Sequence, residues 1–311
     1  MSSELSKNIL NTLAYYDVMD YPMTSFEIWK YLFQLERKDV KGKTENDTSL
    51  PGIAKELKGE KLKKIIEEYN GFFFLKGRKC LVNQRISRNK ISERKIRILL
   101  KVAKILRFVP YVRMIAITGR MAMKNAEEKS DLDVLIVIEE GKIFTGRILV
   151  TLAVHLMGKR RYKGKIANRV CLNYFITTNS LEITMKDMFS SSEYYFISPL
   201  FGRETFRKFQ EKNRWISEYK VNYQESSADN LKTLGDTFLS AKIRYIGEKI
   251  LAFNFIEKMM KVWQIKRINE NPKTHQPGSM IIASDEALVF LPNPQGPKIY
   301  GKFKEKVSSL Y

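Results

Sequence analysis

The sequence predicts an α+β protein with three parts. Residues 1–88 predict helices followed by a β-hairpin, residues 89–185 a core of mixed strands and helices, and residues 186–311 an α-helical region with an irregular tail. Three observations carry this division: a helical stripe with a capping box near the start, two apolar strands on either side of a glycine turn near residue 119, and helical stripes after residue 186. At about 150 residues per domain, 311 residues suit two or three domains.

The balance of charges favours anionic partners. Lysine and arginine number 55 against 34 acidic residues, which gives a net charge of +21. The excess is densest in residues 89–118, which hold eight basic side chains and one acidic side chain. A field of this strength attracts nucleotides, nucleic acid or anionic lipid.

Targeting and membrane signals are weak in this sequence. No uninterrupted apolar run approaches the ~18 residues of a membrane-spanning helix, so we expect no membrane partner. The first residues, MSSELSKNIL, lack the pattern of a secretion signal, and Cys80 and Cys171 are too few for a disulfide scaffold. We therefore expect a cytoplasmic protein.

The first part of the chain predicts three helices. Apolar residues recur at helical spacing from Leu5 to Tyr16, and a second helix is expected after Thr24, because Thr24 and Glu27 form a capping box. Residues 36–50 are polar and predict a loop. A third helical stripe runs from Ile53 to Tyr69, and Gly59 is the point at which it can divide.

A β-hairpin is expected to follow these helices. Its strands are Phe72–Leu75 and Cys80–Val82, with the turn Lys76–Lys79 between them. Three helices and a hairpin resemble a winged helix, which favours DNA or RNA binding, although a packing or dimerising module has the same shape. The candidate recognition helix mixes lysines and glutamates almost evenly, which indicates weak duplex binding.

A long basic amphipathic helix is predicted over residues 89–109 and ends at Pro110. Its apolar side chains face inward and its cations outward, either to steer an anionic ligand or simply to be solvated.

The most informative passage begins after Pro110. A short strand, Met114–Thr118, leads to Gly119, and a helical turn leads to a second strand, Val134–Ile138. Asp131 and Asp133 stand two residues apart at its start, so both carboxylates project from one face with Cα atoms ~6.6 Å apart. Two such carboxylates can share one or two Mg²⁺ ions, although acids in such a loop can also cap backbone amides.

Gly119 lies where the backbone must turn sharply at the end of a strand. Its neighbourhood leaves amides free at a helix N-terminus, against which a triphosphate can lie. A plain turn is the alternative.

This order of strand, glycine, and Asp-x-Asp on a second strand resembles the nucleotidyltransferase superfamily typified by DNA polymerase β. The resemblance implies transfer of a nucleoside monophosphate from a nucleoside triphosphate to a hydroxyl, with two Mg²⁺ ions. The stretches YYDVMDYPMTSFEIW, TGRMAMKNAEEKSDLDVLIV, CLNYFI and NRWI are similar to a group of poorly characterised prokaryotic proteins with this domain. By this resemblance, Asp131 and Asp133 are catalytic and hold metal, while Gly119, Arg120 and Ser130 contact the nucleotide.

Two positions depart from the family pattern. Arg120 replaces the usual serine, and a guanidinium can either bind phosphate or fill the pocket. The third acid is missing from the expected strand Arg169–Ile176, where Asn173 takes the plausible inward position as a neutral metal ligand. Glu182 is an alternative third acid. A catalytically degenerate protein that binds nucleotide or nucleic acid is therefore the second functional hypothesis.

Other polar residues are weaker candidates. The stretch KRRYKGKIANR, residues 159–169, has no acid and suits a polyanion or a solvated loop. His155 and His275 lack partners for a triad or a zinc site. The resemblance makes three arginines of the C-terminal region conceivable ligands, although a solvated face explains each of them: Arg203, Arg207 and Arg214.

Overall fold

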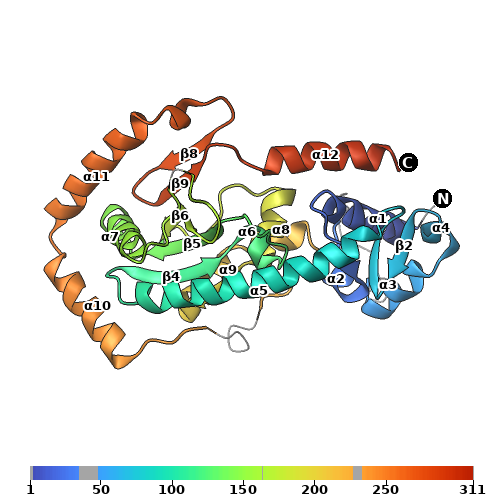
Figure 1. The fold of residues 1–311 in the computed structure, drawn as a ribbon, viewed down its shortest axis with the longest axis horizontal. Helices are drawn as coiled ribbons and strands as arrows, with labels where there is room; N and C mark the ends of the chain where they lie inside the picture. Colours follow the sequence, from blue (N-terminus) through green and yellow to red (C-terminus); the bar gives the residue numbers. More distant parts are fainter. Residues whose placement is uncertain (1–2, 35–47, 163, 227–232, 311) are drawn as a thin grey trace.

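The protein is elongated, with a small N-terminal unit at one end and a larger α/β body at the other (Figure 1). This computed structural model describes residues 3–34, 48–162, 164–226 and 233–310. The predicted loop over residues 36–50 falls almost entirely outside them.

The N-terminal unit packs short helices on a small antiparallel sheet. In its described residues the strand order is β1-β3-β2. The helix predicted over residues 5–16 is confirmed as α1, and the capping box of Thr24 and Glu27 is confirmed at the start of α2. The elements are α1 Glu4–Asp17, β1 Met23–Thr24, α2 Ser25–Lys30, α3 Leu50–Leu57, α4 Glu60–Lys63, β2 Ile66–Tyr69 and β3 Phe72–Leu75.

The hairpin prediction is wrong in its position. The structure pairs β2 with β3 through the turn Asn70-Gly71, and both turn residues have positive φ. An Asn-Gly pair is the sequence signal for such a two-residue turn, and it outweighs the helical spacing that extended the third stripe to Tyr69. Gly59 does separate α3 from α4, as expected.

A 27-residue helix, α5 Cys80–Leu106, connects the two ends of the molecule. Residues 80–82, predicted as a strand, form its first turn. The predicted basic helix over residues 89–109 forms the last two thirds of α5 and ends at Leu106, three residues earlier than expected. The boundary expected at residue 88 therefore falls inside a continuous helix. Arg85 and Arg88 on this helix reach the loop after Gly119: Arg85 donates to the Lys124 carbonyl at 3.0 Å, and Arg88 to Glu127 at 3.1 Å.

The body is built on a mixed sheet. In the described chain it has six strands in the order β7-β4-β5-β6-β9-β8, of which β5 and β6 are parallel and the other pairs antiparallel. The predicted strands at 114–118, 134–138 and 169–176 are confirmed as β4, β5 and β6. The bounds are β4 Val112–Ile117, β5 Leu132–Ile138, β6 Val170–Thr177, β7 Ser198–Phe201, β8 Met280–Ala283 and β9 Ala287–Leu291.

The region after residue 185 is not purely helical, which corrects the sequence-based expectation. Three of its segments, β7, β8 and β9, complete the sheet, so the boundary at 185 divides one structural body. These strands are four or five residues long and mostly apolar, so periodicity alone does not distinguish them from buried helical segments. Its helices are α8 Met188–Phe196, α9 Arg203–Lys212, α10 Phe238–Ile250, α11 Asn254–Asn269 and α12 Gly296–Ser308.

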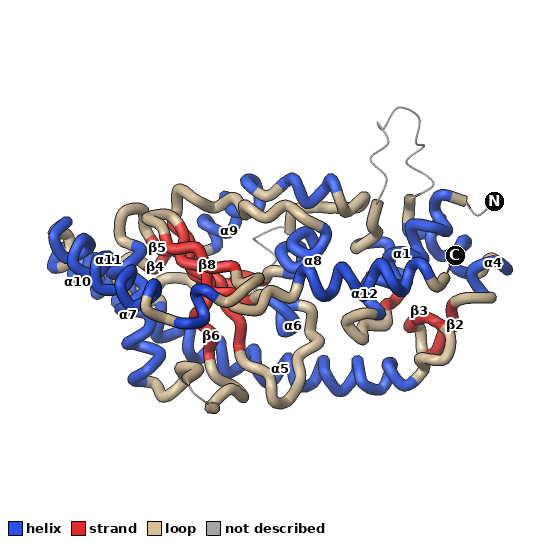
Figure 2. The backbone as a smooth tube through the Cα atoms, turned by 90° about the horizontal axis from the view of Figure 1, so that it is seen from above, coloured by secondary structure: helices blue, strands red, loops and turns tan. Residues whose placement is uncertain are grey.

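Alternate residues of the central strands pack on opposite faces of the sheet. Met114 and Leu135 join the cluster that continues into the N-terminal unit, whereas Ile115 and Ile136 face α5 and α7 Ile143–Leu156. Figure 2 shows α12 extending from the sheet toward α1. Lys306 of α12 donates to Asp17 of α1 at 2.5 Å, which fixes the C-terminal helix to the N-terminal unit. Within the described ranges, none of the helices has the length and apolarity needed to cross a bilayer.

Candidate functional site

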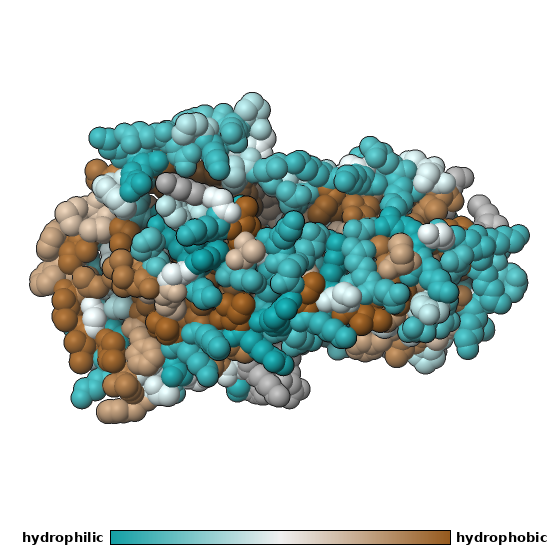
Figure 3. Space-filling view, viewed as in Figure 1, coloured by the Kyte–Doolittle hydropathy of each residue, from teal (hydrophilic) through white to brown (hydrophobic). Residues whose placement is uncertain are grey.

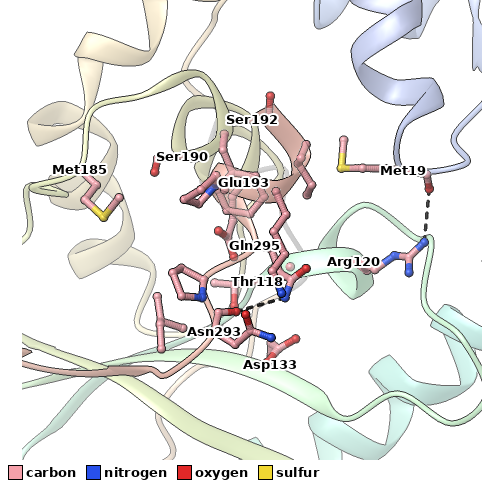
Figure 4. A pocket seen from close by; sticks show the side chains of 18 of the residues that line it. Met19, Thr118, Arg120, Asp133, Met185, Ser190, Ser192, Glu193, Asn293 and Gln295 are labelled. Carbon is pink, nitrogen blue, oxygen red and sulfur yellow. Dashed lines mark hydrogen bonds between the residues drawn. The ribbon is translucent and has the colours of Figure 1, made fainter. Parts of the chain in front are cut away.

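A cavity of about 980 Å³ lies where β4, β5 and β6 meet α8 and the C-terminal segment. Asp131, Asp133, Gly119, Cys171 and Glu193 contribute to its wall. Figure 4 shows this cavity with Asp133, Thr118 and Glu193 around it. The sheet supplies one wall and residues distant in sequence supply the others.

Asp131 and Asp133 face the same space, as the alternation of side chains along a strand predicts. Asp131 immediately precedes β5, and Asp133 is its second residue. Cys171 lies opposite Asp133 on the parallel neighbour β6. One donor atom from each of these three residues lies within 4.8 Å of the other two. The three side chains form one compact group of oxygen and sulfur donors.

Crowding of these groups changes their ionisation. Burial, and then the neighbouring Asp131 carboxylate, raises the pKa of Asp133 to about 6. Burial and the two aspartates raise the pKa of the Cys171 thiol to about 12, so this side chain stays protonated at neutral pH. The group therefore presents two carboxylates and a neutral thiol.

Gly119 occupies the turn that its sequence position predicts. Its φ is +63°, a region that side-chain-bearing residues rarely adopt. A Cβ at this position would lie 3.1 Å from Asp133 Oδ2. The glycine thus permits a close approach between the turn after β4 and the carboxylate on β5.

Glu193 on α8 is a functional candidate that the sequence did not reveal. Its carboxylate accepts a hydrogen bond from the Gly119 backbone amide. Burial, followed by repulsion from Asp133 and Asp187, raises the pKa of Glu193 to about 7 despite this bond. Glu193 follows three serines in a helix 60 residues beyond Asp133, and this context carries no signal of a site.

Arg161 brings the acid-free stretch 159–169 to the site. Its Nη1 atom donates to Asp131 Oδ2 at 2.6 Å and to Cys171 Sγ at 3.4 Å. In the sequence, the high density of positive charge in this stretch is the one feature that points to a role for Arg161, although a solvated loop is the favoured interpretation. The guanidinium occupies a carboxylate oxygen that a divalent cation would also use.

Replacing Arg161 by glutamine is expected to raise the affinity for Mn²⁺, a spectroscopic substitute for Mg²⁺. The ion pair with Asp131 competes with the metal, and a partly exposed ion pair contributes roughly 0.2–1 kcal/mol, which corresponds to about 1.4- to fivefold in Kd. Electron paramagnetic resonance of free Mn²⁺ measures this change. Arg160→Gln, at the exposed neighbouring position, is the control, and equal affinities in both variants would contradict the competition.

The other predicted residues have different outcomes. Arg120 lines the cavity, but it donates to Glu127 at 2.6 Å and to the Met19 carbonyl at 3.3 Å, toward the N-terminal unit (Figure 4). The Ser130 hydroxyl donates to the Glu127 carbonyl at 2.9 Å and closes a turn outside the cavity lining. Asn173 lines the cavity at an irregularity of β6.

The alternative third acid does not reach the site. Glu182 is exposed, pairs with Lys186 at 2.5 Å, and lies outside the lining of the cavity. The three C-terminal arginines, Arg203, Arg207 and Arg214, also lie outside it; Arg207 pairs with Glu204 and Arg214 with Glu225.

A buried lysine holds the turn that precedes Asp131. Lys95 of α5 is 1% exposed, and its Nζ atom donates to the carbonyls of Glu128 at 3.1 Å and Ser130 at 2.7 Å. Because these carbonyls belong to the turn directly before Asp131, Lys95 fixes the start of β5.

Lys95→Met is expected to lower the free energy of unfolding by about 1–3 kcal/mol, since two partly buried carbonyls lose their donor. Urea denaturation followed by circular dichroism measures the loss. Lys90→Met, on an exposed position of the same helix, is expected to change stability by less than about 0.5 kcal/mol. Equal stabilities would show that water replaces the ammonium group without cost.

The C-terminal segment supplies part of the cavity wall. After β9 the chain passes through Pro292, Asn293, Pro294 and Gln295 along the cavity wall and enters α12. Asn293 and Gln295 extend toward Thr118 and Asp133 (Figure 4). The sequence indicated only an irregular, proline-rich tail here.

Comparison of the chain with known protein families, curated proteins and solved structures finds no match.

Proposed function

We propose that the protein is a Mg²⁺-dependent nucleotidyltransferase that moves a nucleoside monophosphate from a nucleoside triphosphate to a hydroxyl acceptor. One observation carries the proposal: Asp131 and Asp133 face a large cavity directly beside the left-handed turn at Gly119. This is the arrangement that the resemblance to the polymerase β superfamily implies for its site.

The donor group suits Mg²⁺. This ion takes oxygen ligands and is commonly held by one or two carboxylates together with water and substrate phosphates. Asp131 and Asp133 supply the carboxylates, and the protonated thiol of Cys171 adds no charge. We propose one ion on the two aspartates, and a second, less strongly held, that would use Glu193 or Asn173.

The chain's own groups divide the remaining work. Gly119 brings a tight backbone turn to the cavity, and Arg161 supplies a cation that can pass from Asp131 to a phosphate oxygen. The acceptor hydroxyl forms a bond to the α-phosphorus while the bond to the β-phosphate oxygen breaks, which releases pyrophosphate and the hydroxyl proton. A bound ion would neutralise charge on the triphosphate. Catalysis is positioning and electrostatic stabilisation.

Incubation with α-labelled nucleoside triphosphates and Mg²⁺ tests this function. We expect label to appear on an acceptor, or pyrophosphate to be released, only with the divalent ion. Asp131→Asn should abolish the reaction, whereas Asp285→Asn, at an exposed loop position, should not. Transfer that survives loss of both Asp131 and Asp133 would refute the assignment.

A specific contact favours a second candidate, a catalytically degenerate domain that binds nucleotide or nucleic acid. The Gly119 amide already donates to Glu193, and Asp131 already pairs with Arg161, so both features of the site have internal partners. Calorimetric titration with Mg²⁺ and ATP separates the candidates, because binding without turnover supports the second. Gel-shift titration tests whether the protein binds nucleic acid, because such binding must weaken steeply as the salt concentration rises.

We also propose that the N-terminal unit is winged-helix-like. Its order α1-β1-α2-α3, followed by the β2–β3 hairpin, supports this, as does the three-stranded sheet in the described residues. We propose a cytoplasmic location as well, because Cys80 and Cys171 are both unpaired thiols.

A further inference from the structure

Polar side chains hold helices α10 and α11 to the body of the molecule, α10 at strand β4 and α11 at helix α7. On α10, Glu248 accepts hydrogen bonds from the Tyr111 amide at 2.9 Å and from Arg113 Nη1 at 2.8 Å, next to β4. Gly247 permits this approach, since a Cβ there would lie 2.5 Å from a carbon of Pro110. The inward face of α10 is thus held by the Glu248 carboxylate and by close contact between the Gly247 backbone and the Pro110 ring.

The inward face of α11 combines polar contacts with apolar ones, since Met260 and Ile265 pack against the core and Ile268 is buried. Both carboxylate oxygens of Glu257 accept from the first amides of α7, those of Phe144 at 2.8 Å and Thr145 at 2.9 Å. Gln264 is 2% exposed, donates to the Phe144 carbonyl at 2.8 Å and accepts from Arg147 at 2.7 Å. Among the described residues of the two helices, the buried ones are Ser240, Gln264 and Ile268.

The outward faces of these helices carry most of their large apolar side chains, with lysines between them. This is the reverse of an ordinary surface helix, which turns its apolar stripe to the core. Figure 3 shows the hydrophobic surface at the end of the molecule remote from the N-terminal unit. We call this surface the apolar band; it comprises Phe238, Leu239, Ile243, Tyr245, Ile246, Ile250, Phe253, Phe255, Met259, Val262 and Trp263, all of them exposed.

The area of the band exceeds what a monomer usually exposes. Phe238 is 85% exposed, Val262 71% and Phe255 64%. Since large side chains bury roughly 150–250 Å² each, the band offers on the order of 1,000 Å². The largest apolar patch of a typical monomer is about 300–600 Å², and a stable dimer needs about 800 Å² from each partner. The area suits a protein interface.

We propose that the apolar band is the contact surface for a second copy of this chain. An isologous pair brings the same band from both copies together, so apolar surface meets apolar surface without any charge complement. The exposed lysines of the two helices, Lys242, Lys249, Lys258 and Lys266, would lie with their charged ends in water at the rim. Nucleic acid would use the aromatic rings and lysines but gain nothing from the isoleucines, leucine and valine.

The charge pattern predicts the direction of the salt dependence. Lysines from both copies repel across the rim, and added salt screens this repulsion while it leaves apolar contact intact. Dimerisation should therefore tighten between 50 mM and 500 mM NaCl, by about twofold or more. Binding to nucleic acid or an anionic bilayer would weaken over the same range.

Sedimentation velocity of the full chain from about 0.5 to 50 µM tests the proposal. We expect a species of twice the 36.4 kDa chain mass, and the double variant Phe255→Ser/Val262→Ser should raise the dissociation constant by about 100-fold or more. Phe26→Ser is the matched control, because Phe26 is also half exposed but lies on the N-terminal unit. Thermal melts confirm that each variant is folded, as substitutions at exposed positions permit.

Several results would overturn the proposal. The proposal fails if the protein is a monomer at 50 µM in both 50 mM and 500 mM NaCl. A dimer that the double variant retains, or that Phe26→Ser disrupts, would place the contact elsewhere. Association that weakens as salt rises would also contradict it. Flotation of the monomeric wild type, but not of the double variant, with phosphatidylglycerol vesicles would assign the band to a lipid surface instead.

Discussion

Asp133→Asn is expected to lower nucleotide transfer by about a thousandfold or more and, at the same time, to make the metal-free protein more stable. The loss of transfer follows from removing one of the two carboxylates that would hold the cation, an effect worth several kcal/mol in the transition state. The gain in stability follows from the site itself, which crowds Asp133 against Asp131 in a largely buried place. A residue that only supports the fold would show the opposite effect on stability.

The pH dependence of this gain has a definite sign. The pKa of Asp133 is about 6 in the fold and about 3.9 in an unfolded chain, so the folded state binds the proton more tightly. Well below pH 4, at about pH 3 or less, the carboxyl is mostly neutral in both states and costs little. From pH 4 to pH 6 and above, its ionisation reduces the stability of the metal-free wild type, by about 1–3 kcal/mol at pH 8. The Asp133→Asn variant has no carboxyl at this position and lacks this decrease.

Urea denaturation at pH 5 and pH 8, with a chelator present, measures the free energy of unfolding of the wild type and of the Asp133→Asn variant. Mg²⁺ added at pH 8 should restore stability to the wild type and leave the variant unchanged, because ligands that bind only the folded state stabilise it. Asp285→Asn should follow the wild type in all these conditions. A variant that still transfers nucleotide, or that loses stability at pH 8, would contradict the role given to Asp133.

The part of the site that the sequence predicts is the part that local geometry determines. Gly119, Asp131 and Asp133 lie on two adjacent strands and the turns beside them, so strand alternation and the glycine pattern suffice to bring them together. The same locality explains the capping box at Thr24, which needs only four consecutive residues.

The part of the site that the sequence does not predict depends on how distant segments pack together in the fold. Three residues of the site come from other segments. Arg161 lies in the connection between α7 and β6, and Glu193 lies on α8. Asn293 follows β9, a strand that no period-2 pattern revealed. The sequence of a single segment does not reveal which side chains will line a cavity between segments that are about 30 to 160 residues apart. The misplaced hairpin differs in kind, because Asn70-Gly71 is a local turn signal that marks the hairpin correctly, whereas the apolar spacing before it favoured a helix.

Gly202→Ala is expected to destabilise the fold by about 4 kcal/mol or more. Gly202 lies between β7 and α9 with φ +85°, where an alanine costs about 1–2 kcal/mol from backbone strain alone. The added Cβ would also lie 2.0 Å from the Arg113 carbonyl oxygen and 2.7 Å from Met114 Cα. These are backbone atoms of β4 at the centre of the molecule, so no side-chain rotation relieves the overlap.

Gly301→Ala is the matched control for this substitution. Gly301 lies within α12, and a Cβ there meets nothing within 4 Å, so alanine should raise stability by about 0.5–1 kcal/mol through its higher helix propensity. Chemical denaturation of both variants measures the two changes in the free energy of unfolding, which we expect to have opposite signs. A loss under about 1 kcal/mol for Gly202→Ala would mean that β7 separates from β4 at little cost. Since β4 leads directly into the Gly119 turn, such looseness would extend to the candidate site and remove the rigid support on which its proposed chemistry depends.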